Sequence, residues 1–133
     1  MNHFQIDENV TEVNFQVICS YLEIYNESVV DLLDVQLPKL NLKEDKRNNV
    51  VVENCKEVQV FSIKDIMDLI KTGLKGRHIA ATNMNAESSR SHAIFSAVIR
   101  METTLNDSEK VVKSSKFNIV DLAGCESLGK TGA

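Results

Sequence analysis

Two short polar motifs carry the residue types of a site that binds phosphate and a divalent metal. The first occupies residues 85–92 and reads Asn-Ala-Glu-Ser-Ser-Arg-Ser-His; the second occupies residues 121–126 and reads Asp-Leu-Ala-Gly-Cys-Glu. Mg²⁺ and phosphate need hard oxygen donors and backbone N–H groups that a ligand can approach closely. Ser88 and Ser89 supply hydroxyls, and Gly124 has no side chain to block the approach. The motifs therefore predict two loops that sense a metal-bound phosphate.

The segment before the second motif supports this interpretation. Residues 117–120 are mostly apolar, and Asp121 follows at their C-terminal end, where P-loop nucleotide triphosphatases hold Mg²⁺ or its water. The phosphate-cradling string Gly-x-x-x-x-Gly-Lys-Ser/Thr is matched once, at residues 124–131, where it overlaps the second motif and leaves no separate phosphate-binding loop in these residues. Because that loop supplies most of the hold on the β- and γ-phosphates, we expect the chain to contain only part of a nucleotide site.

Five collinear motifs resemble the kinesin motor domain, from about Phe15 to the last residue. They are the first motif, similar to switch I; the second motif, similar to switch II; and the segments 20–33, 43–45 and 77–85, with 130–133 in addition. The resemblance implies an α/β fold, namely a partial kinesin-type P-loop sheet with flanking helices and a small antiparallel hairpin lobe. It also implies that residues 1–133 are the central portion of a single motor domain, truncated at both ends.

The resemblance assigns roles to particular residues. It implies that ATP and Mg²⁺ are the cofactors and that the microtubule, through tubulin, is the partner. The implied ATP contacts are Asn85, Ser88, Ser89, Asp121 and Gly124, with Ser88 and Asp121 holding Mg²⁺, partly through water. Arg90 and Glu126 would form a bridge between the switches that positions the attacking water, with Ser89 beside them. Lys46, Arg47 and Lys130 would contact the microtubule.

Each of these residues also has a plainer interpretation. A serine cluster commonly caps a helix or forms a turn, and Arg90 and Glu126 could be solvated surface charges. His92 could simply orient backbone at the start of a strand, and the cations proposed to contact tubulin could be ordinary loop charges. Cys125 stands where the family usually has serine; a thiol is a weaker hydrogen-bond donor, and we interpret this difference as tuning.

Three functions remain open from the sequence. The first is a fragment of an ATP-dependent microtubule motor, located in the cytoplasm on the cytoskeleton or spindle and oligomeric through regions outside these residues. The alternative is a non-enzymatic kinesin-like module that binds microtubules or another protein. A third hypothesis is a fragment of a P-loop GTPase, but the Ser-Ser-Arg-Ser-His string and the lack of an Asn-Lys-x-Asp motif argue against it. We expect the chain by itself to be inactive.

Composition sets wider limits. The chain has 133 residues, 43% hydrophobic and 26% charged, with a net charge of -4. That charge argues against a polybasic nucleic-acid partner, and no apolar run is long enough to cross a membrane. The three cysteines are odd in number and lack metal-ligand spacing, which favours free thiols in an intracellular protein.

The pattern of apolar residues predicts the elements that position the motifs. Residues 1–13 resemble the end of a helix and a loop, and residues 14–25 predict a strand buried on both faces. A polar break and a short apolar stretch at 26–34 precede a hairpin at 40–42 and 50–53 and a short strand at 58–61. A helix is predicted from Ile63 to about Gly76, capped by Ser62 and Asp65, with an apolar stripe formed by Ile63, Ile66, Met67, Ile70 and Leu74. Residues 93–103 and 116–121 predict paired strands that bring His92 near Asp121.

Overall fold

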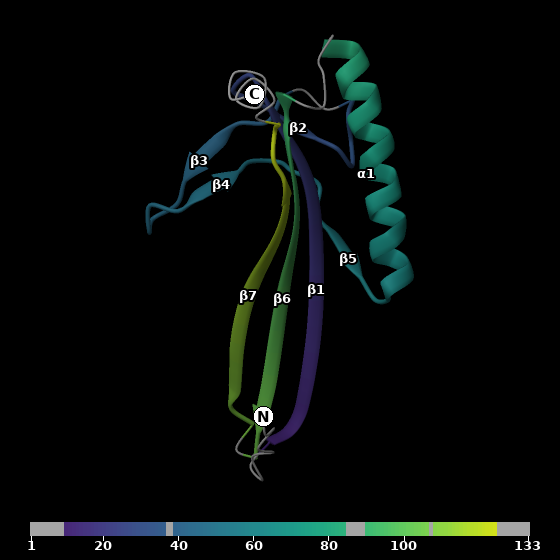
Figure 1. Ribbon diagram of the computed structural model, residues 1–133. Helices are drawn as coiled ribbons and strands as arrows, with labels where there is room; N and C mark the ends of the chain where they lie inside the picture. Colours follow the sequence, from purple (N-terminus) through teal and green to yellow (C-terminus); the bar gives the residue numbers. More distant parts are fainter. Residues whose placement is uncertain (1–9, 37–38, 85–89, 107, 125–133) are drawn as a thin grey trace, which may run out of the picture.

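The computed structural model describes residues 10–36, 39–84, 90–106 and 108–124. Three long antiparallel strands run side by side: β1 (Val10–Tyr25), β6 (His92–Leu105) and β7 (Lys110–Asp121) (Figure 1). Two short strands, β2 (Ser28–Asp31) and β5 (Val58–Val60), pair with successive parts of the other edge of β1. The order along the sheet is β2-β1-β6-β7. The mixed α/β architecture agrees with the expected fold class.

Strand β1 is longer than the sequence predicted. It begins at Val10, so the expectation of a helix end and loop is wrong for residues 10–13; residues 1–9 lie outside the described part. The reason is a long partner, because β6 continues opposite these residues, and the Thr11 hydroxyl also donates to the Thr104 carbonyl over 3.0 Å. At its other end β1 turns tightly into β2 through Asn26 and Glu27, both with positive φ, as a two-residue hairpin requires.

The single helix of the described residues, α1 (Ile63–Met84), begins where it was predicted to begin. The Asp65 amide donates to Ser62 Oγ over 3.2 Å, and the Asp65 carboxylate accepts from the Phe61 amide over 2.9 Å. The first bond satisfies one N–H group that a helix start leaves without a partner, and the second ties Asp65 to the residue before the N-cap. The capping prediction is confirmed.

The predicted end of this helix is wrong, because α1 continues beyond Gly76 to Met84. Gly73 and Gly76 do not terminate the helix but let it approach the rest of the fold. A Cβ at Gly73 would lie 2.2 Å from the Tyr21 ring, and one at Gly76 would lie 2.2 Å from the Leu32 carbonyl oxygen. The extra turns carry Arg77 and position it beside the sheet.

The core lies between α1 and the sheet. Tyr21 and Phe95 meet edge to face there, with ring centroids 5.4 Å apart. The face of α1 that packs on it includes Ile66, Leu69 and Ile70. The predicted apolar stripe is only partly correct, because Ile63, Met67 and Leu74 are exposed. The helix therefore packs on one face of the sheet, against core residues of β1, β5 and β6. Its outer face leaves apolar side chains uncovered.

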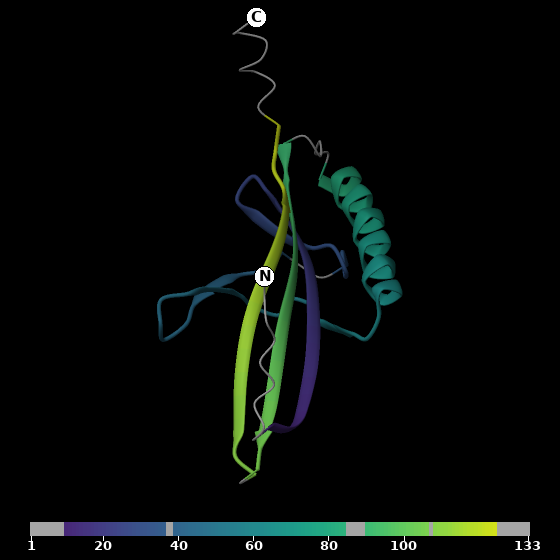
Figure 2. The same ribbon diagram turned by 60° about the horizontal axis from the view of Figure 1, so that its bottom comes forward.

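The predicted hairpin is present, with its first strand at 42–44 instead of 40–42, and forms a separate two-stranded sheet. Its strands are β3 (Leu42–Glu44) and β4 (Val50–Val52), and it projects on the opposite side of the long strands from α1 (Figure 2). At its tip the Asp45 carboxylate accepts from the amides of Arg47 and Asn49 over 2.8 and 3.0 Å. In the part of the chain that the structure describes, no helix is long and apolar enough to cross a membrane.

Candidate functional site

The long hairpin places the ends of the two motifs beside each other. Strand β6 begins at His92, the last residue of the first motif, and β7 ends at Asp121, the first residue of the second. Ala93 pairs with Asp121, and the Ala123 amide donates to His92 Nδ1 over 2.9 Å. The expectation that His92 and Asp121 lie close is therefore confirmed, and the plainer role for His92, orienting backbone, is observed.

One guanidinium joins these motif ends to the body of the fold. Arg77 Nε donates to Glu23 Oε2 over 2.7 Å, and Arg77 Nη1 donates to Asp121 Oδ2 over 2.8 Å. Its Nη2 donates to Ser91 Oγ over 3.0 Å and to the Ser91 carbonyl over 3.4 Å. Arg77 belongs to α1 and Glu23 to β1, so the helix, the central strand and both motifs meet at one side chain.

The cluster is closed on one side and open on the other. Glu23 and Ser91 are each 2% exposed, and the Ser91 hydroxyl donates to Glu23 Oε2 over 3.0 Å. The Asp121 side chain, in contrast, is 71% exposed. Arg77 thus connects a buried acid in the sheet with an accessible acid at the end of β7. This geometry fixes the inner end of the cluster and leaves its outer carboxylate within reach of a ligand.

Electrostatics keep the Arg77 guanidinium charged. Burial by itself would lower the pKa of Arg77, but its hydrogen bonds to Asp121 and Glu23 and the charges of these two acids together raise that pKa. Burial raises the pKa of the neighbouring Tyr21 phenol; the charges of Asp121 and Glu23 act in the same direction, against that of Arg77. The guanidinium is therefore a permanent cation, and the phenol next to it stays neutral at ordinary pH.

Comparison with known proteins decides the family. The model of the kinesin motor domain family matches residues 3–133. Kinesin-like protein KIN-12F of Oryza sativa is 44% identical over 122 residues, which cover 92% of this chain and 4% of that protein. Kinesin-1 heavy chain of Homo sapiens is 42% identical over 130 residues, 98% of this chain and 13% of that protein. The chain belongs to the kinesin motor domain family.

A solved kinesin structure has the same fold. It is a fast kinesin, described for its ATPase mechanism and its interactions with microtubules, and it superposes with a TM-score of 0.79 at 39% identity. The superposition covers 96% of this chain and 34% of that one. The present chain thus spans about a third of the solved motor and a small fraction of the curated kinesins.

The described residues include only some of the expected kinesin site. Asp121 and Gly124 are described and exposed, as is Arg90, which lies two residues before the start of β6. The expected microtubule contacts Lys46 and Arg47 are exposed at the hairpin tip. The remaining expected site residues lie outside the described part: Asn85, Ser88, Ser89, Glu126 and Lys130. The Arg90–Glu126 bridge therefore stays a prediction.

Sequence reasoning missed the two residues that organise the site in this kinesin, Glu23 and Arg77. Both left a signal. Glu23 stands in a strand with apolar residues on both faces, and a buried acid requires a charged or hydrogen-bonding partner. Arg77 falls at helical spacing from Ile70 and Gly73, on the inner face of α1. Recognising that this face continues past Gly76 would have placed Arg77 on the side of α1 that meets the sheet.

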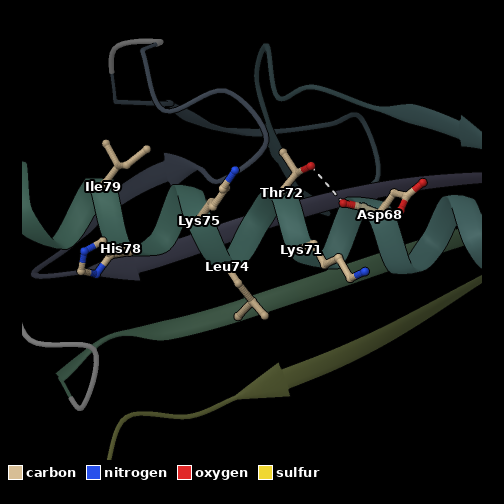
Figure 3. Close-up of a pocket in the computed structure, with 7 residues that line it drawn as sticks. All are labelled: Asp68, Lys71, Thr72, Leu74, Lys75, His78 and Ile79. Carbon is tan, nitrogen blue, oxygen red and sulfur yellow. Dashed lines mark hydrogen bonds between the residues drawn. The ribbon is translucent and has the colours of Figure 1, made fainter.

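An open groove of about 1100 Å³ follows the outer face of α1, away from these residues (Figure 3). Lys71, Lys75 and His78 line it together with the apolar Leu74, and the Thr72 hydroxyl is bonded back to the Asp68 carbonyl over 2.9 Å. None of its lining residues belongs to either motif. The candidate site is therefore the cluster at the ends of β6 and β7.

The accessible carboxylate of the cluster fits the needs of Mg²⁺. Among the described residues no group of three or more His, Cys, Asp or Glu is placed to hold a metal ion. Mg²⁺ usually keeps several waters and binds one or two carboxylates together with substrate phosphates, so a preformed protein cage is not required. Asp121, exposed and held by Arg77, offers one hard carboxylate oxygen of the kind that such a site uses.

Proposed function

We propose that this chain is the part of a kinesin motor domain that senses the ATP γ-phosphate and couples hydrolysis to microtubule binding and movement. In this proposal residues 85–92 act as switch I and residues 121–126 as switch II. The observation that carries it is the Arg77 guanidinium, which binds Ser91 at the end of the first segment and Asp121 at the start of the second. Two loops tied to one rigid side chain suit a switch in which loss of phosphate contacts reorders both.

The proposal gives each motif residue a task. Asn85, Ser88, Ser89 and Gly124 contact the nucleotide, and Ser88 and Asp121 hold Mg²⁺, partly through water. When bound, the metal would neutralise charge that develops on the phosphates. Arg90 and Glu126 bridge the switches and, with Ser89, orient the attacking water. The exposure of Arg90, Asp121 and Gly124 supports these tasks, because each is accessible beside the meeting point of the two strands.

A second surface is proposed for tubulin, whose surface is strongly acidic. Lys46 and Arg47 are exposed at the tip of the β3–β4 hairpin, which extends away from the long strands. Together with Lys130 they would attract the partner through a salt-sensitive interaction. This partner would place the protein on cytoplasmic microtubules, and oligomerisation would use regions outside residues 1–133.

A graft tests the proposal. The chain replaces the segment that it superposes on in the fast kinesin, which supplies the rest of the motor. We expect microtubule-stimulated ATP hydrolysis, and Arg90→Ala or Glu126→Ala should each lower kcat on the order of 10²–10³-fold, as removal of one transition-state contact does, while nucleotide still binds. Lys46→Ala with Arg47→Ala should keep the basal rate and weaken microtubule binding at low salt. Lys71→Ala, at an exposed lysine of α1, is the matched control for the loss of positive charge at the hairpin tip.

A graft that folds and binds ATP without hydrolysing it would favour the non-enzymatic module. The 133-residue chain by itself should bind ATP weakly and not hydrolyse it, because its one Gly-x-x-x-x-Gly-Lys-Ser/Thr string, residues 124–131, overlaps the proposed switch II and leaves no separate phosphate-binding loop. Tight binding of ATP in a calorimetric titration of this chain would show that the missing loop is not needed.

A further inference from the structure

We infer that Glu23 is a positioning residue for the switch region, holding Arg77 and Ser91 in place so that Asp121 can exchange partners without releasing the cluster. The inference rests on the proposed function and extends it to a residue that belongs to neither switch. Glu23 lies in β1, the strand between β6 and the short edge strands. It is therefore attached to the most enclosed strand of the sheet.

A single oxygen atom of Glu23 does the positioning. Glu23 Oε2 accepts from Arg77 Nε over 2.7 Å and from Ser91 Oγ over 3.0 Å. Because a guanidinium is a planar, rigid fork, fixing Nε also fixes the directions of the two Nη groups. Those groups reach Asp121 and Ser91. The orientation of Glu23 therefore sets where both switch ends are held.

The two acids around Arg77 differ in the property that matters for a switch. Glu23 is 3% exposed at its side chain and Asp121 is 71% exposed. A charged group that stays buried keeps its partner, because an unpaired buried charge is strongly unfavourable. Asp121 can instead be solvated or bind a metal-bound water. Glu23 is thus the fixed end of the cluster and Asp121 is the end that can change.

Charge balance explains why an acid is needed at residue 23. Arg77 remains a cation, and its side chain is only 12% exposed. If Asp121 were its sole acidic partner, the guanidinium would follow Asp121 whenever that residue moved toward a ligand. With Glu23 in place, Arg77 and Ser91 keep their positions while Asp121 alters its contacts. The first motif therefore ends at a constant point of the sheet.

A double-mutant cycle in the graft measures this role. The substitutions are Glu23→Gln and Asp121→Asn, and the quantity is the ratio of ATP to ADP affinity at saturating Mg²⁺, measured with fluorescent nucleotide analogues. We expect Glu23→Gln to lower the ratio at least fivefold, and the double variant to fall no further than the stronger single one. Glu12→Gln, at an exposed acid of the same strand, should leave the ratio unchanged and combine with Asp121→Asn multiplicatively, within about twofold.

Hydrogen exchange in the 133-residue chain gives a readout that does not depend on nucleotide. Glu23→Gln should accelerate exchange of the Ser91 and His92 amides about tenfold, by removing the charged acceptor of the Ser91 hydroxyl, and leave the amides of residues 17–19 unchanged. Ser91→Ala removes the same hydrogen bond to Glu23 but retains both buried charges. It therefore tests the inference even if Glu23→Gln fails to fold. Unchanged exchange in Ser91→Ala, or a multiplicative cycle for Glu23 and Asp121, overturns the inference. A wild-type graft without ATPase activity overturns the proposed function instead.

Discussion

The guanidinium of Arg77 sits between two carboxylates of very different exposure, and this difference determines what each bond contributes. Its bond to exposed Asp121 competes with water, so its net contribution to stability is small. Its bond to Glu23 is buried, and removing either buried partner leaves an uncompensated charge. At the scale of single residues, the inner bond therefore decides stability and the outer bond is available for function.

Replacing Arg77 with methionine tests the inner bond. Arg77→Met should lower the free energy of unfolding by about 3–5 kcal/mol, because Glu23 is left buried without its cation. Small domains have only about 5–15 kcal/mol in total, so the loss should be evident in urea denaturation followed by circular dichroism. Arg90→Met, at an exposed arginine, should change stability by no more than about 0.5 kcal/mol. Equal effects of the two substitutions would contradict the burial argument.

The sequence predicted one part of this cluster and not the other. Asp121 was predictable because it ends an apolar strand next to a glycine-containing motif, a local pattern. The contact between Glu23 and Arg77 joins residues 54 positions apart, and no local pattern reveals it. It also depends on α1 continuing past Gly76, which the ordinary role of glycine as a helix terminator argued against.

At the scale of elements, the fit of α1 against the sheet depends on its small residues. Gly73 faces the Tyr21 ring and Gly76 faces the backbone of Leu32, both closer than a Cβ allows. A flexible side chain could move aside, but the Leu32 carbonyl is part of the chain that follows β2. The helix axis is therefore held close to the sheet, which brings Arg77 within reach of Glu23.

Gly76→Ala should destabilise the chain although alanine favours helices. The propensity gain is about 1 kcal/mol, whereas overpacking against backbone costs about 1–3 kcal/mol, so we expect a small net loss of stability. Thermal and urea unfolding measure it, with Lys75→Ala at the neighbouring exposed position as the control. A Gly76→Ala variant more stable than the parent would show that the helix can shift outward without cost.

Most strands were predictable because alternation and turn residues are local, whereas strand lengths were not. Residues 10–13 and 110–115 become strand because long neighbours pair with them. The exposed lengths of β1 and β7 have few apolar residues packed on a core, so hydrophobic patterning gave no signal there. Pairing between distant segments overrode local preference in these cases.

The tip of the β3–β4 hairpin should respond to acid. Hydrogen bonds from the backbone amides of Asn49 and Arg47 lower the pKa of Asp45 below its ordinary value of 3.8. A lowered pKa in the folded state means that the tip is stabilised above about pH 4 and loses this contribution as pH falls through the folded value. The Arg47 and Asn49 amide chemical shifts should titrate accordingly in NMR spectra. Asp45→Ala should abolish that titration and Glu44→Ala should keep it; a midpoint at or above the ordinary value would contradict the prediction.

At the scale of the whole molecule, the sheet has one long edge, β7, and only part of this edge is protected against pairing with another chain. All twelve residues of β7 are exposed, and the strand is the last in the sheet order. Residues 110–116 of the strand contain Lys110, Lys113 and Lys116, and lysines on an edge oppose pairing with another chain. Residues 117–120 have no charge, and Phe117 and Ile119 are 59% and 55% exposed. Association and low stability should therefore originate in residues 117–120.

Substitutions at Ile119 and Phe61 distinguish strand pairing at the β7 edge from non-specific hydrophobic association. The 133-residue chain should show concentration-dependent association in sedimentation velocity, and Ile119→Lys should reduce it several-fold, because a charge there opposes addition of a strand. Phe61→Lys removes an apolar side chain that is 81% exposed but lies outside the sheet, so it should have little effect. In the graft the surrounding motor alters this edge, and Ile119→Lys should instead impair folding. A wild-type chain that stays monomeric and unfolds cooperatively at high temperature would show that three long strands and one helix suffice without further partners.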